Sequence, residues 1–278
     1  MEEKQDYIYQ KQANEFGSVQ NGSYFFWRTE VLMNEYLVGI KKQNQIEKEI
    51  TEQFKIKNVK GNKLKEFYEK RQEMDKQLLN VQFPTLSYCN NYLSVLALRI
   101  FEMQGYLEKI QNFSSEKMYN IIKQIQHSYF IIPYHNFAHG FLVMHLTFSV
   151  PYQSQQFMQF IKDDEQFITL FAALSHDLGH EGVNNSYYNK FNLELSLKYM
   201  GNAVLENMHA SKMFKILKKN PELDIFELMS GGDVQKSNKY KKLFVKIVIK
   251  LYNIFLLFYF KNYVINIQFF YLIKDSSY

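Results

Sequence analysis

The chain has 278 residues, enough for one large domain or for a domain with an appended arm. Hydrophobic residues make up 46% of it and charged residues 22%, which excludes wholesale disorder. The net charge of +5 mildly favours anionic ligands, but the sequence has no lysine and arginine cluster typical of a nucleic-acid-binding surface. The single cysteine, Cys89, excludes an intramolecular disulfide and favours a reducing, cytoplasmic location.

We interpret residues 1–84 as a polar helical N-terminal arm. Between about residues 43 and 79, a polar sequence of mixed charge is interrupted by apolar residues at loose helical spacing, among them Phe54, Phe67 and Met74. This pattern is typical of an amphipathic packing helix or a coiled-coil piece, and also of a solvated helical leader.

Residues 85–245 have a helical pattern almost throughout. Apolar residues recur at helical spacing, with caps predicted at Ser114 or Ser115 and at Asn192. We expect helices over about residues 92–103, 118–129, 138–148, 164–178, 192–197 and 204–217. Strand-like alternation is hard to find, so the predicted fold class is all-α, a compact multi-helix bundle.

The C-terminal residues 246–278 differ in kind from the rest. From 246 to 274 every residue except Gln268 is Lys, Ile, Val, Leu, Tyr, Asn or Phe, which codons rich in A and T encode. We interpret this stretch as a codon-biased tail not native to the fold, such as a translated intron would give. A membrane-associated tail and a buried terminal helix are the alternatives, but Lys250 and Lys261 break its apolar runs, so we expect no membrane association.

Four of the seven histidines lie in two short segments. Residues 134–139 read YHNFAH, and residues 176–185 read HDLGHEGVNN. Because residues four apart share one face of a helix, each segment can direct two imidazoles into one cavity. Imidazole and carboxylate groups bind zinc, manganese or magnesium, and a carboxylate can bridge two ions. The pattern therefore predicts a two-metal site suited to phosphoester hydrolysis.

Together with residues 204–209, which read VLENMH, these segments resemble three motifs of the class I 3′,5′-cyclic nucleotide phosphodiesterases. Those motifs are Y-H-N-x-x-H, H-D-x-x-H-x-G-x-x-N and V-L-E-N-H-H, in the same order, and the resemblance covers about residues 85–245. It implies an all-α catalytic domain that binds two divalent cations, zinc plus magnesium or manganese. The implied reaction is hydrolysis of the 3′ phosphoester bond of cyclic AMP or cyclic GMP to the 5′-nucleotide, in cyclic nucleotide signalling.

The resemblance also implies roles for individual residues. Asp177 would bridge both cations, and with His135 it would lie at the substrate phosphate. His135 would be the general acid that protonates the leaving 3′ oxygen. Position in the motifs implies the remaining roles: His139 and His176 as further metal ligands, His180 and Glu206 as groups that order water around the second cation, and Asn136 and Asn185 as hydrogen-bonded wall residues.

Several departures from the family pattern remove polar groups. Leu142 stands where the family has a carboxylate, and Met208 replaces the first histidine of a His-His pair. The family takes a further metal-binding aspartate and a purine clamp from downstream, where the resemblance stops after Val245; neither Asp275 nor Gln268 is a credible substitute. We therefore expect a domain incomplete at its C-terminal end that binds cations weakly and hydrolyses cyclic nucleotide slowly, if at all.

Two other functions are consistent with parts of the pattern. One is a different HD-type nucleotide phosphohydrolase, which the YHNFAH segment disfavours because it supplies an acid for the cyclic substrate's leaving group. The other is a non-catalytic regulatory or binding derivative of the enzyme, which Leu142 and Met208 favour. The sequence leaves open the choice between cyclic AMP and cyclic GMP, the regulation and the oligomeric state.

Overall fold

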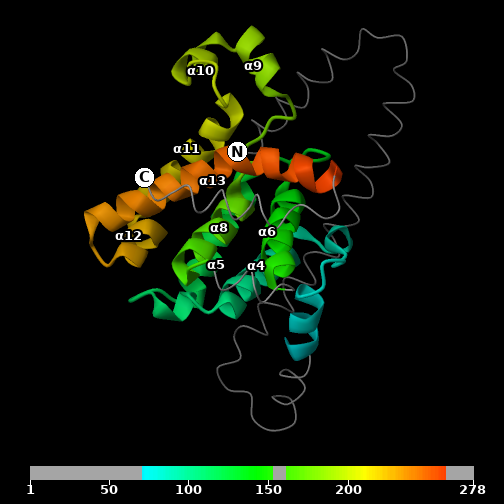
Figure 1. Ribbon diagram of the computed structural model, residues 1–278, viewed down its shortest axis with the longest axis vertical. Helices are drawn as coiled ribbons and strands as arrows, with labels where there is room; N and C mark the ends of the chain where they lie inside the picture. Colours follow the sequence, from blue (N-terminus) through cyan, green and yellow to red (C-terminus); the bar gives the residue numbers. More distant parts are fainter. Residues whose placement is uncertain (1–70, 153–160, 261–278) are drawn as a thin grey trace. The chain divides into compact units, whose positions relative to one another are not determined.

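The computed structural model describes residues 71–152 and 161–260, all of which belong to one compact unit. Most of the predicted arm (1–84) and the end of the predicted tail (261–278) lie outside the described residues. Within the described ranges every regular element is helical (Figure 1), which confirms the predicted all-α class. No helix in those ranges has the length and apolar character needed to cross a membrane.

The six helices that were predicted individually are present in the predicted order, with boundaries shifted by a few residues; those over residues 185–191, 225–230 and 234–260 were not among them. In the first described range they are residues 71–78, α4 (Asn90–Gln104), α5 (Ser115–Ser128) and α6 (Phe137–Tyr152). In the second they are α8 (Asp163–Ser175), α9 (Asn185–Phe191), α10 (Leu193–Lys198), α11 (Val204–Lys219), α12 (Ile225–Ser230) and α13 (Val234–Phe260). Short 3₁₀ turns cover Thr85–Ser87, Leu107–Lys109 and Pro221–Leu223.

Side-chain caps explain where several of these helices begin. Ser114 accepts a hydrogen bond from the Lys117 amide at 3.2 Å, and Asn192 accepts one from the Leu195 amide at 3.1 Å. Each satisfies an amide that the first turn of a helix leaves without a partner. Both caps were predicted from the sequence, with Ser114 rather than Ser115 at the start of α5.

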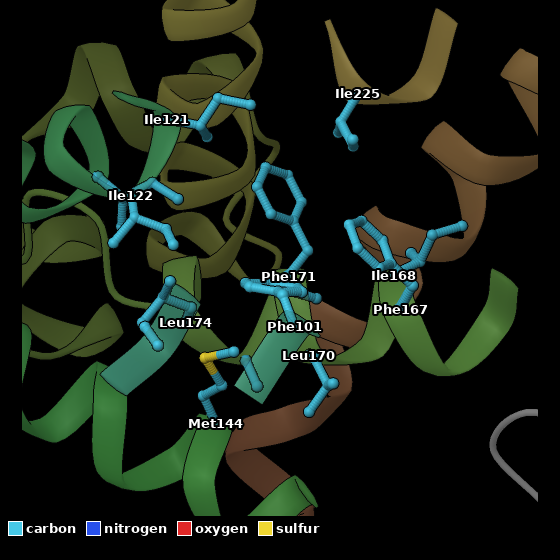
Figure 2. Packing of buried hydrophobic residues seen from close by; sticks show 14 of the residues in the cluster. Phe101, Ile121, Ile122, Met144, Phe167, Ile168, Leu170, Phe171, Leu174 and Ile225 are labelled. Atoms are coloured by element: carbon cyan, nitrogen blue, oxygen red, sulfur yellow. The ribbon is translucent and has the colours of Figure 1, made fainter. Parts of the chain in front are cut away.

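Helix α8 is the centre of the hydrophobic core. Its first turn carries Asp163, Asp164 and Glu165, whose negative charges interact favourably with the positive end of the helix dipole. Every residue from Gln166 to Ser175 is buried. It packs most extensively against α6 and α13. Figure 2 shows Phe171 of α8 among side chains from α4, α5, α6 and α12. A helix buried on all sides gives residues at its end a rigid support.

Helices α6 and α8 approach each other closely at Gly140. A Cβ atom at Gly140 would lie 2.6 Å from the hydroxyl oxygen of Tyr129 and 2.9 Å from the carbonyl oxygen of Leu174. That hydroxyl is buried, donates a hydrogen bond to the Leu174 carbonyl at 2.9 Å and accepts one from the Asp177 amide at 3.3 Å. The missing side chain at Gly140 thus leaves room for Tyr129 to hold the end of α8.

Helices α9 and α10 lie apart from this core and pack on each other, and α9 also packs on α11 (Figure 1). A small separate cluster of Tyr188, Val204, Leu205 and Met208 holds them. Among the polar residues of their outer surface, two large hydrophobic side chains are exposed: Phe191 is 65% exposed and Leu197 is 66% exposed.

Helix α13 continues across the predicted domain boundary at residue 245. Beyond that boundary, Ile247, Val248 and Leu251 are buried in the same core as Phe244. The first residues of the predicted tail therefore pack as part of the helical domain.

Candidate metal centre

The predicted site residues gather around one buried carboxylate, that of Asp177. The Nε2 atoms of His176 and His139 lie 3.1 and 3.5 Å from Asp177 Oδ2. The Nε2 atom of His209 lies 3.9 Å from the other oxygen, Oδ1. The two oxygens of one carboxylate thus face two different sets of imidazoles.

The local geometry differs from the expectation that each histidine pair shares a helix face. His135 precedes α6, whereas His139 lies in its first turn; His176 directly follows α8, and His180 lies in the turn beyond. Neither pair lies within one helix, so that explanation from helical spacing was wrong. The imidazoles converge because two helix ends meet, with Asn136 accepting a hydrogen bond from the His139 amide at 3.2 Å to cap α6.

The turn after α8 is held by α11. Gly179 adopts a left-handed conformation with φ of 65°, which ends the helical path. On α11, His209 Nδ1 lies 2.8 Å from the Leu178 carbonyl oxygen, and the Lys212 ammonium donates to the Gly179 carbonyl at 2.9 Å. Two consecutive carbonyls of the turn are therefore fixed by two side chains one turn apart on a helix.

Hydrogen bonds assign the proton on three of the imidazoles. A carbonyl oxygen can only accept, so His209 carries its proton on Nδ1, and so does His176, whose Nδ1 lies 2.9 Å from the Ala173 carbonyl. Conversely, the Gly182 amide donates to His180 Nδ1 at 2.9 Å, so neutral His180 carries its proton on Nε2. When neutral, His176 and His209 therefore present a lone pair at Nε2, and His180 presents an N–H.

Burial keeps most of the imidazoles neutral. It lowers the pKa of His139 and of His180 to about 4 and that of His209 to about 3, since the attraction of Asp177 only partly offsets it. Burial raises the pKa of Asp177, but the adjacent His176 and the other imidazoles lower it by more than burial raises it. The net pKa of Asp177 therefore lies well below its usual range. At neutral pH the site therefore holds an ionised carboxylate beside neutral imidazoles at His139, His180 and His209, the protonation states that metal ligands need. His176 differs, because burial lowers its pKa but the attraction of Asp177 outweighs burial and raises it.

The arrangement fits divalent cations. Asp177 Oδ2 is buried without a hydrogen-bond partner although two imidazoles lie close to it. Two triplets have mutually close ligand atoms, all within 4.8 Å of one another: His139, His176 and Asp177, and Asp177, His180 and His209. A shared carboxylate between two such groups is the geometry of a two-cation site.

The remaining predicted residues surround this centre. His135 is half-buried and stacks on His180 with ring centroids 3.8 Å apart, and burial lowers its pKa. Glu206 belongs to neither triplet: both its oxygens accept hydrogen bonds from the Asn185 amide, at 3.0 and 3.2 Å. The same Asn185 side chain accepts from the Leu205 amide at 2.8 Å and thereby links α9 to α11.

Sequence reasoning gave no role at the site to three residues that shape it: Tyr129, His209 and Lys212. His209 ends the segment VLENMH, so the third motif already pointed to it. Tyr129 and Lys212 act through backbone atoms of the 174–179 segment, and no motif spacing reveals such contacts.

Comparisons with known proteins agree with this geometry. The sequence profile of the family described as 3′5′-cyclic nucleotide phosphodiesterase matches residues 134–250. The cGMP-specific 3′,5′-cyclic phosphodiesterase alpha of Plasmodium falciparum is 36% identical over 138 residues, which is 50% of this chain and 14% of that protein. The 3′,5′-cyclic-nucleotide phosphodiesterase regA of Dictyostelium discoideum is 34% identical over 149 residues, which is 52% of this chain and 18% of that protein.

Solved structures show the same fold. The phosphodiesterase domain of the Salpingoeca rosetta rhodopsin phosphodiesterase superposes with a TM-score of 0.58 at 23% identity, covering 70% of this chain and 62% of that one. LmjPDEB1 in complex with IBMX superposes with a TM-score of 0.56 at 27% identity, covering 64% of this chain and 55% of that one. The chain spans less than a quarter of the length of the curated relatives named here.

Proposed function

Because the chain carries part of a class I 3′,5′-cyclic nucleotide phosphodiesterase catalytic domain, we propose that it hydrolyses the 3′ phosphoester bond of cyclic AMP or cyclic GMP with the aid of divalent cations. The product is the 5′-nucleotide, and the chain acts in cyclic nucleotide signalling in the cytoplasm. The observation that carries the proposal is Asp177, whose buried Oδ2 has no hydrogen-bond partner and lies within 3.5 Å of the Nε2 atoms of His139 and His176.

In this proposal His139, His176 and Asp177 would hold the first cation, and Asp177 would also contribute to the second. When bound, zinc with magnesium or manganese neutralises the phosphate charge and makes water more acidic. The described residues supply three protein ligands to the first cation, which suffices in other enzymes but gives a weaker site than four. Turnover by this chain is therefore slow.

His135 supplies the leaving-group proton. It is half-buried at the edge of the cluster, where a substrate can reach it, and it stacks face to face on His180. Although burial lowers its pKa in the free protein, an anionic phosphodiester beside it favours the protonated form. Transfer of that proton to the 3′ oxygen lets this oxygen leave as a hydroxyl. His180 presents its Nε2–H to water or to a phosphate oxygen, and Glu206, held by Asn185, orders water at the second cation.

The test separates binding from chemistry. The purified chain, with Mn²⁺ and either cyclic AMP or cyclic GMP, should form the 5′-nucleotide slowly. His135→Ala should lower the rate by about 10²–10⁴-fold while bound manganese stays unchanged, because the acid is not a ligand. Turnover unchanged in His135→Ala would exclude the role assigned to that residue.

The alternatives predict different outcomes of the same assay. A chain that binds manganese but forms no 5′-nucleotide would be a non-catalytic derivative. Hydrolysis of linear nucleotides in preference to cyclic ones would indicate a different HD-type phosphohydrolase.

A further inference from the structure

We propose that Tyr129 is a positioning residue for the first cation: its hydroxyl group ends α8 in a way that leaves the Ala173 carbonyl free to orient His176. Tyr129 touches neither the cation nor the substrate, and it acts through the backbone of α8. The inference rests on the proposed function, since it assumes that His176 and Asp177 bind a cation, but part of its test needs no metal.

Three helices fix the position of the Tyr129 side chain. Tyr129 directly follows α5, and its ring meets that of Phe137 of α6 edge-on, with ring centroids 6.0 Å apart. Tyr129 is 4% exposed, and its hydroxyl oxygen passes Gly140, where a Cβ atom would lie 2.6 Å from it. The hydroxyl group therefore reaches α8 through a narrow space that leaves it little freedom to move.

The first of two backbone hydrogen bonds that α8 gives up at its end is the one at Asp177. In a continuing helix the Asp177 amide would donate to the Ala173 carbonyl, four residues earlier. It donates instead to the Tyr129 hydroxyl at 3.3 Å. The Ala173 carbonyl accepts from His176 Nδ1, 2.9 Å away. The carbonyl that orients this imidazole is thus the one that the Asp177 amide has left.

The second bond that α8 gives up lies one residue further on. The Leu178 amide turns back to the Ser175 carbonyl at 3.3 Å, in place of the Leu174 carbonyl that a continuing helix would offer. The Tyr129 hydroxyl donates to the Leu174 carbonyl at 2.9 Å. A single hydroxyl group thus pairs with one amide and one carbonyl of the helix end, and leaving such groups unpaired away from water is costly.

Loss of the hydroxyl group would change the competition for the Ala173 carbonyl. In Tyr129→Phe the Asp177 amide loses its acceptor, and the Ala173 carbonyl is the one that helical geometry offers it. His176 would then share its acceptor, so its ring would be held less firmly with Nε2 facing Asp177 Oδ2, 3.1 Å away. Loss of a group that orients a metal-binding histidine typically weakens metal binding by about 10–100-fold. We expect an effect of that size on the first cation.

A matched pair of tyrosine substitutions tests this role. Tyr240 is similarly buried, and its hydroxyl group also bonds to α8, where it donates to Asp164 Oδ2 in the first turn at 2.6 Å. Tyr240→Phe therefore removes the same atom from the opposite end of the same helix. Calorimetry measures Mn²⁺ binding to the purified 278-residue chain and to both variants, and urea unfolding measures their stability.

Both variants should be less stable than the unaltered chain, but only Tyr129→Phe should bind its tightest ion about 10–100-fold more weakly. Unchanged affinity in Tyr129→Phe, or an equal loss in Tyr240→Phe, would overturn the role, because the hydroxyl group would then act on stability alone. If the unaltered chain bound no ion, the proposed function would be rejected, and a measurement on the metal-free chain would decide whether Tyr129 positions His176.

That measurement follows protons at the end of α8 by nuclear magnetic resonance. In the unaltered chain the Tyr129 hydroxyl proton should exchange slowly with water and show a nuclear Overhauser effect to the Asp177 amide proton. Absence of this effect would overturn the proposal even if Tyr129→Phe did not fold. The His176 Nδ1 proton, identified by its loss in His176→Asn, should exchange roughly tenfold faster in Tyr129→Phe and at an unchanged rate in Tyr240→Phe. Equal rates in all three chains would contradict the role.

Discussion

Helix α8 and the pair α9–α10 are joined by the turn that carries His176, Asp177 and His180, but they are held in different ways. Ten consecutive residues of α8 are buried, from Gln166 to Ser175, whereas α9 and α10 rest on a cluster of four buried residues and expose Phe191 and Leu197. The ligands proposed for the first cation lie where α6 begins and α8 ends, against the core, whereas the turn beyond them is held to α11 by the contacts of His209 and Lys212 with the Leu178 and Gly179 carbonyls. The difference predicts that the first cation site is the more robust of the two.

The largest effect is expected at the carboxylate that both halves share. Asp177→Asn should abolish metal binding and catalysis together, because the amide cannot supply an anionic bridge. Glu206→Gln is the matched control: it makes the same chemical change at a residue outside both triplets, and it should retain the metal. Metal content after dialysis and 5′-nucleotide formation measure both variants; retained metal in Asp177→Asn would refute the shared-bridge arrangement.

Substitutions should lower the free energy of unfolding much more in α8 than in α9. Phe171→Ala removes a fully buried ring from the centre of the core and should cost about 3–5 kcal/mol. Phe191→Ala, at a ring that is 65% exposed, should change the free energy of unfolding by less than about 0.5 kcal/mol. Urea unfolding of both variants gives the comparison. Equal costs would show that the α9–α10 surface is as well packed as the core.

A smaller effect is expected where α6 meets α8. Gly140→Ala places a methyl group 2.6 Å from the Tyr129 hydroxyl and 2.9 Å from the Leu174 carbonyl and should cost about 1–3 kcal/mol. Tyr129→Phe in the same chain should recover part of this cost, because the nearest atom is removed. Urea unfolding of the single and double variants gives the coupling; strict additivity would show that the hydroxyl is not the source of the clash.

The metal-free protein should also show a pH dependence of stability. His139 and His180, with pKa values lowered to about 4, and His209, at about 3, have folded pKa values below the ordinary value of 6.5. Their contribution to stability is therefore present above about pH 6.5 and declines as the pH falls towards 4. His176, whose pKa is raised, opposes this trend. Urea midpoints at about pH 7.5 and pH 5 in EDTA should show the decline, and His209→Asn should reduce it; a higher midpoint at the lower pH would contradict it.

The sequence predicted the fold class and the helix order because apolar residues recur at helical spacing and because the Ser114 and Asn192 caps are local features. It also predicted which residues meet at the site, through motifs, although the helical-face explanation for their convergence was wrong. The end of α8 at Ser175 depends on Tyr129 and Lys212, which hold the next residues by their backbone. Long-range contacts of that kind leave no periodic pattern in a single sequence.

The course of α13 past residue 245 constrains how the gene could encode this protein. Phe244, Ile247, Val248 and Leu251 form pairs three or four residues apart (244/247, 244/248, 247/251 and 248/251), so they lie along one buried stripe of the helix. If splicing removed the codons after 245, the replacement exon would have to restore apolar residues in the same helical register. A reading frame that did not restore these apolar residues would leave the part of α8 that α13 covers in contact with water. Packing against α8 therefore limits which residues can follow residue 245.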